Sequence, residues 1–213
     1  MSYGMEAVLV VPVENMTEGR FSDVWRVLSG FQRTSLGEMT VKNPSVPIFE
    51  TTSPTVHYID GIPDISFWRS SEAYDGCPPA LPEGTDALRI GVSEGHLVGL
   101  EGHHDRFLGI METVFTGMDA IYAVTLHELD LSVEEMPWEE FRMLLGGVHM
   151  YSRRLVEDVG RERMMAAAPD GGALGDGGIW LRFQEEFFYG MPLEYHEGMR
   201  ALLDEMWERV TVS

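Results

Sequence analysis

Short apolar runs separated by turn-forming residues dominate the first part of the chain. Residues 7–13 form an apolar run with a proline near its end, which is typical of a buried strand. Residues 56–60 and 65–69 are rich in aromatic and β-branched side chains and flank a Gly-Ile-Pro-Asp turn. Residues 87–92 and 96–100 flank a Ser-Glu-Gly turn in the same manner. These patterns predict two β-hairpins.

Apolar residues at helical spacing mark four longer segments. The first begins at Ser22, whose hydroxyl can cap a helix, and extends to about Thr34. Residues 105–117 and 192–210 show the same period. A long helix is also predicted over residues 137–159, because a proline opens it and apolar side chains recur every three or four positions. A pair of glycines in its middle should weaken it.

Two further apolar segments, residues 120–126 and 179–183, predict strands in the second half of the chain. The glycine-rich segment 170–178 predicts a flexible loop. Hairpins in the middle and single helices towards the end favour an α+β fold, with a mixed, largely antiparallel sheet packed by two or three helices of the C-terminal half. At roughly 150 residues per domain, the length predicts a single domain, residues 1–213, in which a loop near 75–86 leaves open two sub-lobes.

Charge narrows the possible partners. The chain has 35 acidic and 15 basic residues and a formal net charge of −20, and most of the excess lies in residues 101–213. A surface this negative excludes nucleic-acid phosphates and anionic membranes as partners. It favours a protein partner that presents a basic face.

Other features indicate the compartment. No basic segment followed by an apolar stretch opens the sequence, and no apolar run is long enough to span a membrane. A single cysteine, Cys77, excludes an internal disulfide and a four-cysteine zinc site. We therefore expect a cytoplasmic protein.

The segment Glu101-Gly-His-His-Asp105 holds the densest group of potential metal ligands. Together with His127, at the end of a predicted strand, the residues His103, His104 and Asp105 predict a divalent-metal site. A metal-assisted hydrolase is the enzyme that such a site would support. The alternative is a polar surface turn without a cofactor, because adjacent histidines rarely bind one ion and no H-E-x-x-H motif follows His127. The second interpretation is preferred, so the sequence favours a binding protein over an enzyme.

Two other motifs have simpler interpretations. Gly91-Val-Ser-Glu-Gly95 matches the G-x-S-x-G nucleophile elbow, but the residues that follow predict a strand, so a hairpin turn is the better interpretation. His149 lies between two apolar residues in the predicted long helix. We expect it to be a partly buried, hydrogen-bonded histidine.

An acidic segment before the predicted long helix is the best candidate for partner binding. Residues 128–140 contain six acidic side chains, no basic one and interleaved apolar residues. The predicted contact residues are Glu134, Glu135, Trp138, Glu139 and Glu140, with burial of the tryptophan following electrostatic attraction. The alternative is a solvent-exposed segment at the start of the helix, whose carboxylates stabilise the helix by interacting with the positive end of its dipole.

The sequence thus predicts a small acidic protein that binds another protein, in the manner of an inhibitor or an immunity protein against a basic partner. Two alternatives remain open. One is the metal-assisted hydrolase, and the other is a homo-oligomeric assembly subunit that buries its methionine and aromatic side chains between copies.

Overall fold

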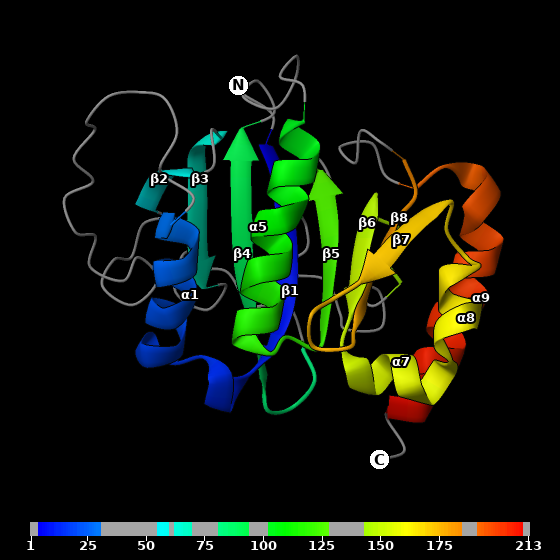
Figure 1. The fold of residues 1–213 in the computed structure, drawn as a ribbon. Helices are drawn as coiled ribbons and strands as arrows, with labels where there is room; N and C mark the ends of the chain where they lie inside the picture. The colour runs from blue at the N-terminus through cyan, green and yellow to red at the C-terminus, as the bar shows by residue number, and fades with distance from the viewer. Residues whose placement is uncertain are drawn as a thin grey trace.

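The protein is described by a computed structural model that covers residues 4–30, 55–59, 62–69, 81–93, 102–127, 143–184 and 191–210. Its eight strands form one sheet in the order β2-β3-β4-β1-β5-β6-β8-β7, and every neighbouring pair is antiparallel (Figure 1). The strands are β1 Gly4–Pro12, β2 Thr55–Ile59, β3 Ile62–Arg69, β4 Thr85–Ser93, β5 Tyr122–His127, β6 Val148–Tyr151, β7 Asp170–Ala173 and β8 Ile179–Arg182. The predicted α+β fold with a largely antiparallel sheet is confirmed.

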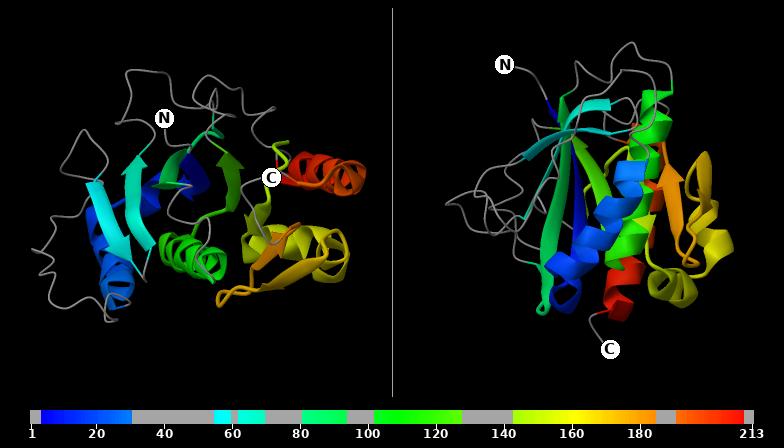
Figure 2. Two further views of the ribbon diagram at one scale, coloured as in Figure 1. Left: turned by 90° about the horizontal axis from the view of Figure 1, so that it is seen from above. Right: turned by 60° about the vertical axis from the view of Figure 1, so that its left-hand side comes forward.

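Helices cover both faces of the sheet (Figure 2). The helices are α1 Glu18–Gly30, α5 His103–Met118, α7 Arg153–Val159, α8 Arg161–Met165 and α9 Leu193–Val210, with a 3-10 turn, η1, at Val13–Asn15. α1 and α5 pack on one face, which we call the α5 face. α9 packs on the other with α7 and α8, and we call it the α9 face. None of the described helices has the length and apolar character needed to cross a membrane.

The central strand β1 explains the apolar run at the start of the sequence. Ala7, Leu9 and Val11 point to the α5 face, whereas Val8 and Val10 point to the α9 face. Because helices or other segments bury both faces, successive positions must all be apolar, and no polar alternation appears. β1 pairs with β4 on one side and with β5 on the other, so it joins the two halves of the chain in one sheet.

α1 and α5 lie close together on their face of the sheet. A Cβ atom at Gly117 would lie 2.5 Å from a methyl group of Val24, so this contact between the helices requires glycine. α1 begins earlier than predicted, because the hydroxyl of Thr17, rather than that of Ser22, accepts the backbone N–H of Arg20 at 3.3 Å. The predicted helix at 105–117 is confirmed and starts two residues earlier.

The predicted long helix over residues 137–159 is wrong in its middle, whereas its last seven residues are helical as predicted. Residues 148–151 form β6, an interior strand that pairs with β5 and β8, and α7 begins only at Arg153. All four residues of β6 are buried, and a short run that is buried on both faces has no alternation to distinguish it from a helix. Gly146 lies against the neighbouring strand: a Cβ there would be 2.1 Å from the backbone oxygen of Thr125. Residues 137–142 lie outside the described residues.

The predicted flexible loop at 170–178 is also wrong, because it contains β7 and the turn of an ordered hairpin with β8. In the turn, the N–H of Leu174 bonds the carbonyl of Gly178 at 3.0 Å, and Gly177 adopts a positive φ of 95°. Gly172 lies on the ring of Trp180, where a Cβ would be 2.6 Å from Nε1. The glycines therefore permit close packing here rather than mobility.

The remaining predictions have mixed outcomes. The hairpin β2–β3, the strands β5 and β8 and the last helix are confirmed. The second strand of the other predicted hairpin, residues 96–100, lies outside the described residues. Of the predicted loop near 75–86, residues 85 and 86 already belong to β4, and residues 75–80 are not described.

Candidate functional site

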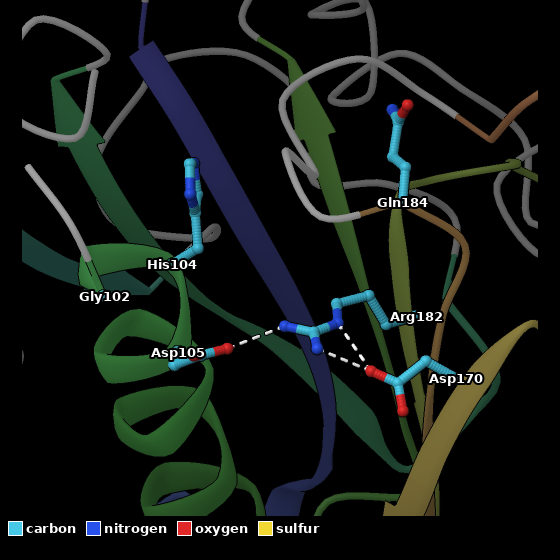
Figure 3. A pocket seen from close by; sticks show the side chains of 6 residues that line it. All are labelled: Gly102, His104, Asp105, Asp170, Arg182 and Gln184. Atoms are coloured by element: carbon cyan, nitrogen blue, oxygen red, sulfur yellow. Dashed lines mark hydrogen bonds and ion pairs between the residues drawn. The ribbon is translucent and has the colours of Figure 1, made fainter. Parts of the chain in front are cut away.

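Two hollows lie at opposite ends of the sheet. The smaller one, of about 270 Å³, lies at the start of α5, and we call it the Arg182 pocket. It is lined by Gly102, His104, Asp105, Asp170, Arg182 and Gln184 (Figure 3). The larger one, of about 730 Å³, lies where α5 ends and α7 begins, and we call it the acidic groove. Its charged side chains are Glu14, Glu83, Asp119, Arg153, Arg154, Glu157 and Asp176.

A single cation pairs with two carboxylates in the Arg182 pocket. Arg182, at the end of β8, places Nη1 2.7 Å from Asp105 Oδ1 and Nε 2.9 Å from Asp170 Oδ2. Its guanidinium also lies 5.7 Å from the ring centre of Trp180. Partial burial opposes the charge, but the hydrogen bonds to the two carboxylates outweigh it and raise the pKa of Arg182. One cation therefore bridges α5 to the β7–β8 hairpin.

The residues predicted to bind a metal ion diverge in this region. His103, His104 and Asp105 are consecutive in the first turn of α5, so their side chains leave the helix in different directions. Asp105 points to Arg182, whereas His104 points away from these ion pairs (Figure 3). Among the residues that the structure describes, no three His, Cys, Asp or Glu side chains gather as metal ligands would. The side chain of His127, which ends β5, is not described, so the four-residue metal site stays a prediction.

The acidic groove is formed by segments far apart in the sequence. The end of β1, the turn before β4, the residue after α5, the start of α7 and the β7–β8 turn all reach the same end of the sheet. This follows from the antiparallel topology, in which the end of one strand lies beside the start of its neighbour. The partly exposed side chains of Pro12 and Ile121 add an apolar part to the same surface.

Carboxylates outnumber guanidinium groups in the acidic groove by five to two. Arg153 forms an ion pair with Glu157, in which Nε lies 2.6 Å from Oε1, and this hydrogen bond raises the pKa of Arg153. Asp119, which adopts a positive φ of 52°, lies 3.8 Å from Arg20 and remains mostly exposed. On the nearby α5, the pKa of Glu112 is raised, first by partial burial and then by the charge of Asp176. The potential in this region is therefore negative.

The predicted partner-binding residues are not tested by the structure. Glu134, Glu135, Trp138, Glu139 and Glu140 all lie in residues 128–142, outside the described residues. In the serine motif, Gly91 and Ser93 belong to β4, and the residues that follow Ser93 are not described. The sequence analysis missed the acidic groove, because its carboxylates are scattered over five segments. Most of them lie in short segments between or close to the ends of longer elements, which was the available signal.

Comparisons with known proteins give little further information. No family model matches the chain, and no curated protein matches its sequence. Among solved structures, the chain is similar to the Pseudomonas aeruginosa T6SS protein PA0821, with a TM-score of 0.44 and 9% sequence identity. The match covers 96% of this chain and 73% of that chain. At this TM-score and identity, the similarity supports no conclusion about function.

Proposed function

We propose that the protein acts by binding a protein partner with a basic face, and that the acidic groove receives basic side chains of that partner. The observation that carries the proposal is the excess of carboxylates in the groove, where five carboxylates face two guanidinium groups. An inhibitor- or immunity-like role is the form of binding that we propose for it.

The shape and the lining of the groove support this proposal. A volume of about 730 Å³ accommodates several side chains at once. Lysine and arginine have long apolar stems, which can pack on the partly exposed Pro12 and Ile121 while their charged ends reach the carboxylates at the rim. The net charge of −20 would attract a basic partner from a distance and increase the rate of encounter.

A charge-neutralised variant tests the location of binding. The groove variant combines Glu14→Gln, Glu83→Gln and Asp119→Asn, and asparagine tolerates the positive φ at position 119. The matched control combines Glu162→Gln, Glu197→Gln and Asp204→Asn, which are exposed carboxylates on α8 and α9. Both variants lose three negative charges, so any difference between them reports position rather than net charge.

The probe is a hexa-arginine peptide, with hexa-citrulline as its neutral counterpart, and the readout is isothermal titration calorimetry at low and high salt. At roughly 0.2–1 kcal/mol for each exposed pair, the groove variant should bind hexa-arginine about tenfold more weakly at low salt. The control variant should stay within about twofold of the native protein. Equal losses in both variants, or equal binding of hexa-citrulline, would contradict the proposed site.

A further inference from the structure

A group of fully buried polar side chains lies on the α9 face of the sheet. Tyr122 on β5 and both His149 and Tyr151 on β6 are fully buried, and we call these three residues the His149 cluster. The hydroxyl of Tyr122 lies 3.0 Å from Nδ1 of His149. The ring of His149 stacks on that of Tyr151, with centroids 6.1 Å apart and an interplanar angle of 8°. The prediction that His149 is hydrogen-bonded is confirmed, and its burial is complete.

Hydrogen-bond counting assigns the proton positions in this cluster. Within the part of the chain that the structure describes, neither His149 Nε2 nor the Tyr151 hydroxyl makes a well-formed hydrogen bond. If Tyr122 donates to Nδ1, the proton of the neutral imidazole is on Nε2, and hydrogen bonding to the backbone of Gly146 favours a protonated ring nitrogen. If Nδ1 donated instead, the lone pair of Nε2 would face no donor among the described residues. The first arrangement, with Tyr122 donating to a neutral imidazole, is therefore favoured.

Among the contacts that the described residues make with this ring, none is with a charged side chain. On β5 the ring faces Tyr122, on β6 Tyr151, and at the end of β8 the ring of Phe183 at 5.8 Å. α9 contributes Trp207, which packs edge-on against Tyr122, and Tyr195, which packs behind Phe183. The titratable groups on this side of the ring are thus tyrosines.

The charged side chains of α9 that the structure describes are exposed or paired with another helix. Glu205 pairs with Arg163 of α8, and Glu194, Glu197, Arg200 and Asp204 are exposed. His196, the other imidazole on α9, bonds the carbonyl oxygen of Met191 at 2.7 Å. For His149 itself, burial lowers the pKa to about 3 and outweighs the opposing effect of the Gly146 backbone.

We propose that His149 is an acid-sensitive switch: the neutral imidazole holds α9 on the sheet, and protonation of Nδ1 releases α9. A proton on Nδ1 removes the acceptor of the Tyr122 O–H group. It also places a positive charge in a core of aromatic rings without a counter-ion among the described residues. Moving α9 away admits water to the ring, because Met199, Leu202, Leu203, Met206 and Trp207 of α9 belong to the apolar cover of this face. Among the described residues, the other buried histidine is His103, at the first residue of α5, and it retains 7% exposure, so we expect opening on the α9 side first.

Hydrogen–deuterium exchange with mass spectrometry on the full chain tests this proposal. The protection of α9 amides is compared with that of α5 amides at pH 7 and pH 5, after correction for intrinsic exchange rates. With a pKa of about 3 in the folded state and 6.5 in the unfolded state, the protection of α9 relative to α5 should fall about 30-fold.

Two substitutions distinguish the switch from general acid sensitivity. His149→Gln keeps an acceptor for Tyr122 but does not titrate, and His149→Phe serves as a second variant if the first fails to fold. Either one should keep the ratio of α9 to α5 protection constant between pH 7 and pH 5. His103→Gln, in the first turn of α5, should retain the 30-fold fall of the native chain. The proposal is overturned if native α9 keeps its protection at pH 5, or if a folded His149 variant loses it as the native chain does.

Discussion

The two faces of the sheet are both well buried but are built from different chemistry. On the α5 face, Phe21, Trp25 and Phe67 form a cluster of aromatic rings with centroids 5.8–6.5 Å apart. On the α9 face, Tyr122, His149 and Tyr151 add two hydroxyl groups and an imidazole to a similar cluster of rings. Packing on the first face depends on shape alone, whereas the second face also depends on protonation and on one hydrogen bond. The faces should therefore respond differently to the same perturbation.

The largest expected effect is the loss of a large side chain from the α5 face. Phe67→Ala removes a fully buried ring that contacts Phe21 and Trp25, and it should lower the free energy of unfolding by about 3–5 kcal/mol. Because no titratable group takes part in this cluster, the loss should be the same at pH 7 and pH 5. Urea denaturation at both pH values measures it. A loss that changed by more than about 1 kcal/mol with pH would show that the two faces are coupled.

The next effect is the pH dependence of stability that arises from the α9 face. The folded-state pKa of His149 is lowered, so the unfolded chain binds the proton more tightly, and stability falls as the pH drops below 6.5 towards 3. Between pH 7 and pH 5 the contribution of His149 should decrease by about 2 kcal/mol. Urea denaturation of the native chain and of His149→Gln over this pH range isolates the contribution of His149 to the free energy of unfolding. If the two proteins lose stability in parallel as the pH falls, His149 is not the source of the pH dependence.

A smaller effect is expected when His149 loses its hydrogen-bond donor. Tyr122→Phe keeps the ring and its contact with Trp207 but leaves Nδ1 of His149 buried without a partner. The expected loss is about 1–3 kcal/mol at pH 7, which is the usual cost of an unsatisfied buried polar group. Thermal or urea unfolding of Tyr122→Phe, measured in parallel with the native chain, gives this loss. No measurable loss would mean that the bond at 3.0 Å contributes little.

The smallest effect, and one of opposite sign, is expected for the neighbouring tyrosine. Tyr151→Phe removes the same hydroxyl group from the same strand pair, but this hydroxyl has no partner among the described residues. The substitution should be neutral or should stabilise the fold by up to about 1 kcal/mol. Unfolding measured in parallel with Tyr122→Phe gives a direct comparison. Equal losses in both variants would show that ring contacts, rather than hydrogen bonds, distinguish the α9 face.

The parts of the fold that the sequence predicted are those in which one physical signal dominates. α5 and α9 each bury a stripe of apolar residues at helical spacing, and β1 is a long apolar run next to a proline. β6 was missed because four buried residues fit the periods of a strand and of a helix equally well. The β7–β8 hairpin was missed because its glycines suggest mobility, whereas Gly172 is required by the adjacent ring of Trp180.

The candidate site was less predictable than the fold. Burial and hydrogen bonding of His149 follow from its apolar neighbours in the sequence, but its tyrosine partner is 27 positions away and only the pairing of β5 with β6 brings the two together. The acidic groove needs five chain segments at one end of the sheet, and strand order cannot be derived from periodicity. The sequence analysis instead predicted partner binding at residues 128–140, where acidic residues are dense along the chain.

The position of β1 has a consequence for the order of assembly during synthesis. This strand precedes the other described strands in the chain, and its neighbours are β4, Thr85–Ser93, and β5, Tyr122–His127. Its first edge can be paired once β4 is made, but its second edge only after more than half of the 213 residues. Until β5 is made, at least one open edge of this apolar strand is available to other chains, which is the usual route to aggregation of nascent proteins. Pairings this distant in sequence also slow folding. A long loop must close, at a cost in conformational entropy, before the stabilising contacts between the strands can form. We therefore expect chaperones to bind residues 4–12 during translation, and this binding should no longer be needed once β5 has emerged and paired with β1.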